Sequence, residues 1–182
     1  MTGSTNPLTA GDQPGPLSSP VGTSLAVRRF FPEESHGLPG AFQPVLAWWK
    51  HLRGDRQMPY REDMRFRDLR GWHSSVLLSE VTECATDCTC RLAGEDVRTA
   101  FCGRIRPGTR YSSLDFLPDE TRKDHIAALV EDGVLGHGVG QVTMGEGRTV
   151  PLDVLDLPLA DKAGRAAFIL AFFAFPLPIQ LT

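Results

Sequence analysis

Four cysteines are the residues whose types and spacing first suggest chemistry in this sequence. Cys84, Cys88 and Cys90 lie close together along the chain, and Cys102 follows them. Thiolates gathered in this way bind zinc, although the spacing of the first three is unlike that of common zinc sites and no nearby histidine completes the set. Cysteine is also among the residue types most often buried in cores. We therefore expect a structural role for these thiols, with a metal or redox site as the alternative.

The groups that other catalytic sites need do not come together in the sequence. Serines such as Ser74 lie outside any Gly-x-Ser-x-Gly nucleophile motif. The glycine-rich run at 136–140 follows a predicted helix and precedes a strand, the reverse of the order that points helix amides at phosphate. A local basic cluster of Arg91, Arg104, Arg106 and Arg110 offers a site for an acidic ligand or phosphate group, but solvated loop arginines are the simpler interpretation. The sequence favours a protein that is not an enzyme, with a small enzyme on an α+β fold as an alternative.

Composition limits the size and class of the protein. With 182 residues, of which 41% are hydrophobic, the chain is long enough for one domain with a real core. Its net charge of -3 gives no sign of a basic face for nucleic acid. The first residues lack the basic start and apolar stretch of a signal peptide, and the apolar run at 166–175 is too short to cross a bilayer. We therefore expect a cytoplasmic protein that binds neither nucleic acid nor membrane.

Hydrophobic spacing divides the chain into a leader and a series of helices and strands. Residues 1–38 are rich in Pro, Gly, Ser and Thr, which predicts a flexible leader. Helices are predicted at 41–53, where apolar residues recur at three- and four-residue steps, and at 95–101 and 119–135. Strands are predicted at 76–81, 88–92, 139–144, 150–157 and 166–175. This order of elements indicates an α+β fold with an antiparallel sheet.

Two motifs carry a resemblance to a known family. The first, at 48–59, reads WWKHLRGDRQMP, and the second, at 91–94, reads RLAG. Together they resemble the motifs of a bacterial single-domain PAS family. The resemblance implies that residues 39–178 form a PAS-like domain with a five-stranded antiparallel sheet, helices on one face and an N-terminal helix. It also implies a sensing and docking role in signal transduction, with no catalysis.

The resemblance gives His125 a further interpretation as a haem ligand. In haem-binding PAS sensors the proximal histidine occupies a similar place on the long helix, and a neutral imidazole facing an apolar cavity suits haem iron. Ile126, Leu129 and Val130 define the apolar side of the predicted helix, and His125 lies at its margin, next to Asp124. An ordinary helical histidine and no cofactor are therefore expected, and haem is the minority alternative.

The phase of the predicted strands and helices indicates which residues face a ligand pocket and which an interface. The expected pocket residues are Leu78, Cys90, Leu92, Val97, Phe101, Leu129, Val142 and Phe172. The expected interface consists of aromatic residues on or near the first helix: Phe42, Trp48, Trp49 and Trp72. Both faces of the strand at 166–175 are apolar, so one face needs a cover, either the first helix or a second subunit. A homodimer is therefore expected.

Together these patterns predict a non-catalytic, cytoplasmic PAS module that binds a small ligand, a signalling protein or both. The family departs from this sequence at Cys88 and Cys90, where it often has bulky aromatic residues. Their smaller side chains would leave more room for a ligand. The alternatives are a haem or metal sensor that uses His125 or the cluster of Cys84, Cys88 and Cys90, and a small enzyme.

Overall fold

The computed structural model describes residues 22–82, 84–114, 119–143 and 149–175. Residues 1–21 of the expected leader and 176–178 of the expected domain lie outside these ranges. The strands are β1 (Gly22–Phe30), β2 (Val76–Val81), β3 (Cys88–Ala93), β4 (Leu135–Thr143), β5 (Thr149–Ala160) and β6 (Ala166–Phe173). The helices are α1 (Gln43–Arg53), α2 (Glu95–Ala100) and α3 (Asp119–Ala127), and α3 continues into a π-helical turn, η5 (Ala128–Asp132). Short 3-10 turns are η1 (Pro32–Glu34), η2 (Gly40–Phe42), η3 (Phe66–Leu69) and η4 (Tyr111–Ser113).

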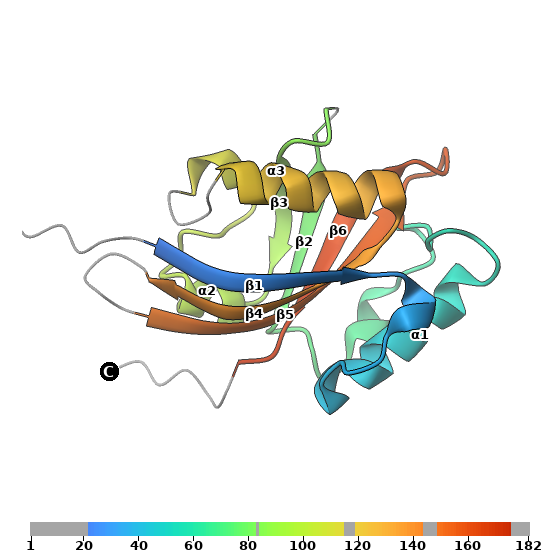
Figure 1. The fold of residues 1–182 in the computed structure, drawn as a ribbon, viewed down its shortest axis with the longest axis horizontal. Helices are drawn as coiled ribbons and strands as arrows, with labels where there is room; N and C mark the ends of the chain where they lie inside the picture. The colour runs from blue at the N-terminus through green and yellow to red at the C-terminus, as the bar shows by residue number, and fades with distance from the viewer. Residues whose placement is uncertain (1–21, 83, 115–118, 144–148, 176–182) are drawn as a thin grey trace, which may run out of the picture.

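The strands form a single antiparallel sheet in the order β1-β4-β5-β6-β2-β3 (Figure 1). The sheet therefore has six strands, where five were expected. The additional strand is β1, which lies in the segment assigned to the leader, and it pairs with β4 along its whole length. This pairing satisfies the backbone groups that β1 and β4 present to each other, so a segment with few bulky apolar residues is still ordered.

Gly140 in β4 allows the backbone of β1 to lie close to that of β4. A Cβ at this position would lie 1.9 Å from the carbonyl oxygen of Ser24 and 2.9 Å from the Cα of Leu25, both in β1. Any side chain at Gly140 would therefore push β1 away from β4, because the contacts are with backbone atoms that cannot turn aside. The glycine-rich run at 136–140 thus belongs to a strand, and Gly140 in it allows the neighbouring strand to pair closely.

Helices cover both faces of the sheet. α3 lies along one face and α1 lies on the other (Figure 1). The core on the α1 side includes Phe42 and Trp49 from the helical segment and Leu78, Leu170 and Phe172 from the sheet. The core on the α3 side includes Leu77, Ala171 and Phe173, which are the next residues along β2 and β6, together with residues of α2. Because side chains alternate along a strand, β2 and β6 are apolar on both faces.

Trp49 anchors α1 to the sheet. Its side chain is 0% exposed, and its indole Nε1 donates a hydrogen bond of 3.0 Å to the carbonyl oxygen of Pro158 in β5. Val45 and Leu46 are buried on the same side of the helix, which ends at Gly54 with a positive φ of 56°. The second face of the last strand is therefore covered by α1 from the same chain, so this face does not require a second subunit as its cover.

A β-bulge shifts the phase of β3. Leu78 pairs with Leu92, but Ser79 pairs with Cys90, so Arg91 is an extra residue on β3. A bulge of this kind places the residues on its two sides out of simple alternation. Cys90 accordingly packs on the α3 side, and Leu92 packs against the core on the α1 side.

None of the helices in the described ranges combines the length and apolar character that would let it span a membrane.

Candidate ligand-binding cavity

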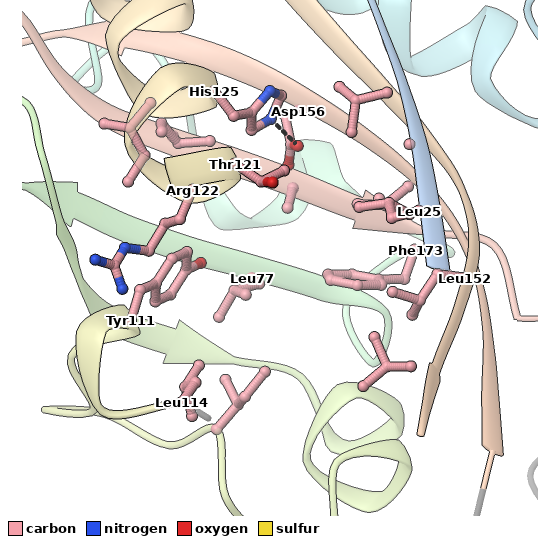
Figure 2. A pocket seen from close by; sticks show the side chains of 18 of the residues that line it. Leu25, Leu77, Tyr111, Leu114, Thr121, Arg122, His125, Leu152, Asp156 and Phe173 are labelled. Carbon is pink, nitrogen blue, oxygen red and sulfur yellow. Dashed lines mark hydrogen bonds and ion pairs between the residues drawn. The ribbon is translucent and has the colours of Figure 1, made fainter. Parts of the chain in front are cut away.

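A cavity of about 180 Å³ lies on the α3 side of the sheet (Figure 2). Strands β1, β2, β4, β5 and β6 all contribute apolar side chains to its walls, among them Leu25, Leu77, Val142, Leu152 and Phe173. The helices and the connection between them add Phe101, Ile105, Leu114, Ile126 and Leu129. Most of the wall is therefore apolar, and a ligand enclosed here is bound mainly by burial of its apolar surface.

Two glycines of β4 make room in this region. A Cβ at Gly136 would lie 2.4 Å from Cε1 of the His125 imidazole, so this ring occupies the space that a side chain would need. Gly138 lines the cavity, and a Cβ there would lie 3.1 Å from the Val154 side chain and 3.3 Å from that of Leu25. The alternating glycines thus create space for His125 and for the cavity.

The polar groups of the cavity include a histidine and an aspartate that join α3 to β5. The Nε2 of His125 donates a hydrogen bond of 2.8 Å to Oδ2 of Asp156, and Figure 2 shows this contact with Thr121 beside it. The side chains of His125 and Asp156 are 18% and 17% exposed. This contact ties the helix over the cavity to a central strand, and it places a carboxylate in an apolar wall.

Tyr111 closes another part of the cavity. Its hydroxyl lies 2.7 Å from the hydroxyl of the buried Ser79 in β2, and the two groups share a hydrogen bond. Burial raises the pKa of Tyr111 well above its ordinary value, and the nearby Cys88 raises it further. The phenol therefore remains neutral at physiological pH, and it holds η4 against the sheet.

Asp87 organises a buried polar network beside the cavity. Its side chain is 6% exposed and accepts hydrogen bonds from the Cys88 backbone N–H, from Arg110 and from both the N–H and the hydroxyl of Ser112. The Arg122 guanidinium, from α3, lies 3.9 Å away and is 5% exposed. Burial raises the pKa of Asp87, but the hydrogen bonds from Ser112, Cys88 and Arg110 outweigh burial and hold it below the ordinary 3.8. One carboxylate thus links the β2–β3 hairpin, η4 and α3.

Asp87 is expected to make stability fall in acid. A carboxyl group with a lowered pKa in the folded state stabilises the fold above its unfolded-state pKa, and this contribution is lost as the pH falls through the lower folded-state pKa. The ordinary value is 3.8, so the urea midpoint should decline below about pH 4. An Asp87→Asn variant should show a shallower decline in urea titrations across this range. Equal slopes in the two proteins would contradict the assignment.

Three of the expected pocket residues line the cavity, namely Phe101, Leu129 and Val142. Cys90 and Val97 are buried on the same side, in the core behind the lining. The other three, Leu78, Leu92 and Phe172, pack on the α1 side. The bulge accounts for Leu92. Leu78 and Phe172 differ by one residue from the lining positions Leu77 and Phe173, because both faces of β2 and β6 are apolar and hydrophobicity alone does not choose between them.

Asp156 was not among the site residues expected from the sequence. It lies in the apolar run of β5, between Leu155 and Leu157, whose side chains are 0% exposed. A charged residue inside such an apolar run needs a polar partner, and this need was the feature of the sequence that could have indicated a site at Asp156. The partner, His125, is distant in sequence, so only the packing of α3 on β5 brings the two together.

The candidate metal ligands are separated in the structure. Across the described ranges, His, Cys, Asp and Glu side chains form no group of three that would hold a metal ion. Cys84 is exposed, whereas Cys88 and Cys90 are buried free thiols. Burial raises the pKa of Cys90 to about 11 and also raises that of Cys88, so both remain thiols at physiological pH.

The cavity does not fit the haem alternative. The Nε2 of His125, the atom that would bind iron, is hydrogen-bonded to Asp156. A cavity of ~150 Å³ accommodates benzene, and a haem macrocycle is several times larger than that. The cavity of about 180 Å³ is therefore too small for haem.

The expected interface residues form part of the core. Phe42 and Trp49 are 0% exposed, and Trp48 and Trp72 are partly buried against the same cluster. The ring of Trp72 stacks on Phe42, with centroids 5.7 Å apart, and meets Phe172 edge-on at 5.5 Å. These aromatic groups pack inside the chain because the α1 face of the sheet is itself apolar, so they do not form an exposed patch.

No curated protein matches this chain. A solved structure described as an RNA-binding light-oxygen-voltage receptor aligns with 84% of this chain and 39% of its own chain, at 13% identity and a TM-score of 0.47. A likeness of this size carries no argument about what the present chain binds. A family model described as a PAS domain matches residues 40–174, most of the chain, so this chain belongs to the PAS domain family.

Proposed function

We propose that this PAS domain is a non-catalytic sensory module that binds a small molecule in the cavity beneath α3. The observation that carries the proposal is a mainly apolar cavity whose walls come from five strands and three helical segments. The side chains of a protein interior normally pack closely and leave few voids. A cavity of this size is therefore a feature that requires an explanation. We further propose that the module acts in the cytoplasm, in bacterial signal transduction, as the sequence resemblance implies.

The volume indicates the size of the ligand. An apolar cavity of ~150 Å³ holds benzene, so the present cavity of about 180 Å³ suits a molecule with one ring and a small substituent. Larger cofactors would require the walls to move. The proposal therefore concerns a small metabolite-sized molecule.

The contacts of α3 suggest how binding would be transmitted. Ile126 and Leu129 pack over the cavity, and polar contacts tie the helix to β5 through His125 and to the β2–β3 hairpin through Arg122. The helix then widens into the π-turn η5, a feature often found at functional sites. A ligand that changes the packing of α3 would shift the balance between two arrangements of the domain.

The signal would leave the domain through a protein contact. β6 presents Ala171 and Phe173 to the cavity and Leu170 and Phe172 to the α1 side, so a shift on one face reaches the other. A signalling partner on the α1 side of the molecule fits this route. A homodimer remains a prediction from the sequence, and sedimentation measurements with and without ligand would test it.

An Ala171→Leu variant is expected to lose binding of small apolar probes. Ala171 is 4% exposed and lines the cavity, so the larger side chain would fill the space that a probe occupies. Toluene at about 100 times its Kd should raise the unfolding free energy of the natural protein by about 2.7 kcal/mol. The variant should show no such gain in urea denaturation with and without toluene.

An Ala166→Leu variant is the matched control. Ala166 lies on the same strand but packs toward the α1 side, away from the cavity. Its stabilisation by toluene should equal that of the natural protein. If Ala171→Leu is stabilised as much as this control, toluene binds elsewhere and the cavity is not the binding site.

A further inference from the structure

Asp156 has an acceptor oxygen available at the cavity. Oδ2 accepts the hydrogen bond from His125, whereas Oδ1 accepts none from the described part of the chain. The side chain lines the cavity and retains 17% exposure. An ionised carboxylate offers about four acceptor positions, and leaving them without donors in an apolar wall is unfavourable. We therefore expect a hydrogen-bond donor to occupy the position next to Oδ1.

Three other polar residues near the cavity make contacts within the chain. The Tyr111 and Ser79 hydroxyls bind each other. Arg122 makes ion pairs with Asp119 at 3.0 Å and with Asp87 at 3.9 Å. In Figure 2 its guanidinium points away from Asp156. Within the described residues, Nε and Nη1 of Arg122 and the buried Nδ1 of His125 also make no hydrogen bond. Asp156 is the carboxylate of the lining, and its Oδ1 is an open acceptor.

The charge of Asp156 also limits the ligand. An anionic ligand in the same apolar space would place two negative charges close together at low dielectric, which is costly. A neutral donor avoids this cost, and a hydrogen bond to a charged group is stronger than one between neutral groups. The available volume leaves room for one ring.

We propose that the cavity binds a neutral, single-ring molecule that carries one hydroxyl or N–H group and donates it to Oδ1 of Asp156. This inference rests on the proposed function, since it names the ligand class of the same cavity. Phenol is the simplest member of the class. Toluene has the same shape without the donor, and benzoate adds a negative charge.

The test compares these three probes by isothermal titration or ligand-observed NMR with the full chain. Phenol should bind about tenfold or more tightly than toluene, which is the range expected for a hydrogen bond to a charged acceptor. Benzoate should not bind. If phenol and toluene bind equally and Ala171→Leu abolishes both, the ligand class is wrong while the proposed function stands. If no probe binds, both proposals fail.

Variants of two aspartates on the same strand provide the matched comparison. Asp156→Leu should remove the preference for phenol and keep toluene binding. Asp153 makes an equivalent contact of 2.8 Å with His137, but on the other face of β5, so Asp153→Leu should keep the preference. A phenol preference that survives in Asp156→Leu overturns the inference.

A conservative variant keeps the test decisive if Asp156→Leu does not fold. Asp156→Asn retains the shape and one acceptor oxygen but removes the charge. It should reduce the preference for phenol and permit benzoate to bind more readily, because the repulsion is gone. Exclusion of benzoate to the same degree as in the natural protein would contradict the role of the Asp156 charge.

Discussion

Replacing Asp87 with alanine is expected to lower the free energy of unfolding by about 3–5 kcal/mol, because it breaks a buried ion pair from one side. The change removes the acceptor for Arg110, for Ser112 and for the Cys88 backbone N–H. It also leaves the guanidinium of Arg122, which is 5% exposed, with only the exposed Asp119 as an ionic partner. Urea denaturation followed by circular dichroism measures the loss.

Two further variants separate the buried network from ordinary surface pairing. Glu80→Ala removes an exposed ion pair with Arg91 in the same hairpin and should cost at most about 1 kcal/mol. Adding Arg122→Met to Asp87→Ala should restore part of the lost stability, since the uncompensated charge is removed. If the double variant is no more stable than Asp87→Ala, the loss of stability does not come from leaving the Arg122 charge buried without its partner.

The second large effect is expected at Trp49. Trp49→Ala should lower the free energy of unfolding by about 3–5 kcal/mol, as large-to-small changes of buried aromatic residues do. The indole is 0% exposed between α1 and the sheet, and its removal also leaves the buried Pro158 carbonyl without its donor. Denaturant titration gives the loss, and toluene binding by the variant shows whether the cavity on the opposite face persists.

Two controls identify the origin of the Trp49 effect. Trp49→Phe keeps most of the ring and loses the hydrogen bond, so it should cost only about 1–3 kcal/mol. Phe66→Ala truncates an aromatic residue that is 57% exposed and should change stability by about 0.5 kcal/mol or less. A loss at Trp49→Ala no larger than that at Phe66→Ala would show that α1 contributes little to the core.

The order of helices and strands could be predicted because local patterns report it. Three- and four-residue spacing marked the helix before Gly54, and the runs of branched and aromatic residues marked β2, β5 and β6. The long helix was expected to continue to 135, but it ends after the π-turn at Asp132, and β4 begins at Leu135. Such end points depend on neighbouring elements more than on local spacing.

The strand β1 could not be predicted in the same way. Its few bulky apolar residues, Leu25, Val27 and Phe30, lie in a segment whose composition is that of a leader. It is a strand because β4 offers a long edge and because Gly140 allows the two backbones to meet. Composition describes what a segment can bury alone, and a partner strand supplies hydrogen bonds that composition does not reveal.

The cavity likewise combines features that the sequence predicts with features that depend on tertiary packing. The sequence alone was sufficient for the family, for the two-sided apolar character of β6 and for the helix positions Phe101 and Leu129 that line the cavity. The choice of Leu77 and Phe173 over their neighbours depended on tertiary packing, because α1 and α3 cover opposite faces and both faces are apolar. The meeting of His125 with Asp156 likewise depended on the docking of α3, since a contact between residues far apart in sequence is set by packing and not by local pattern.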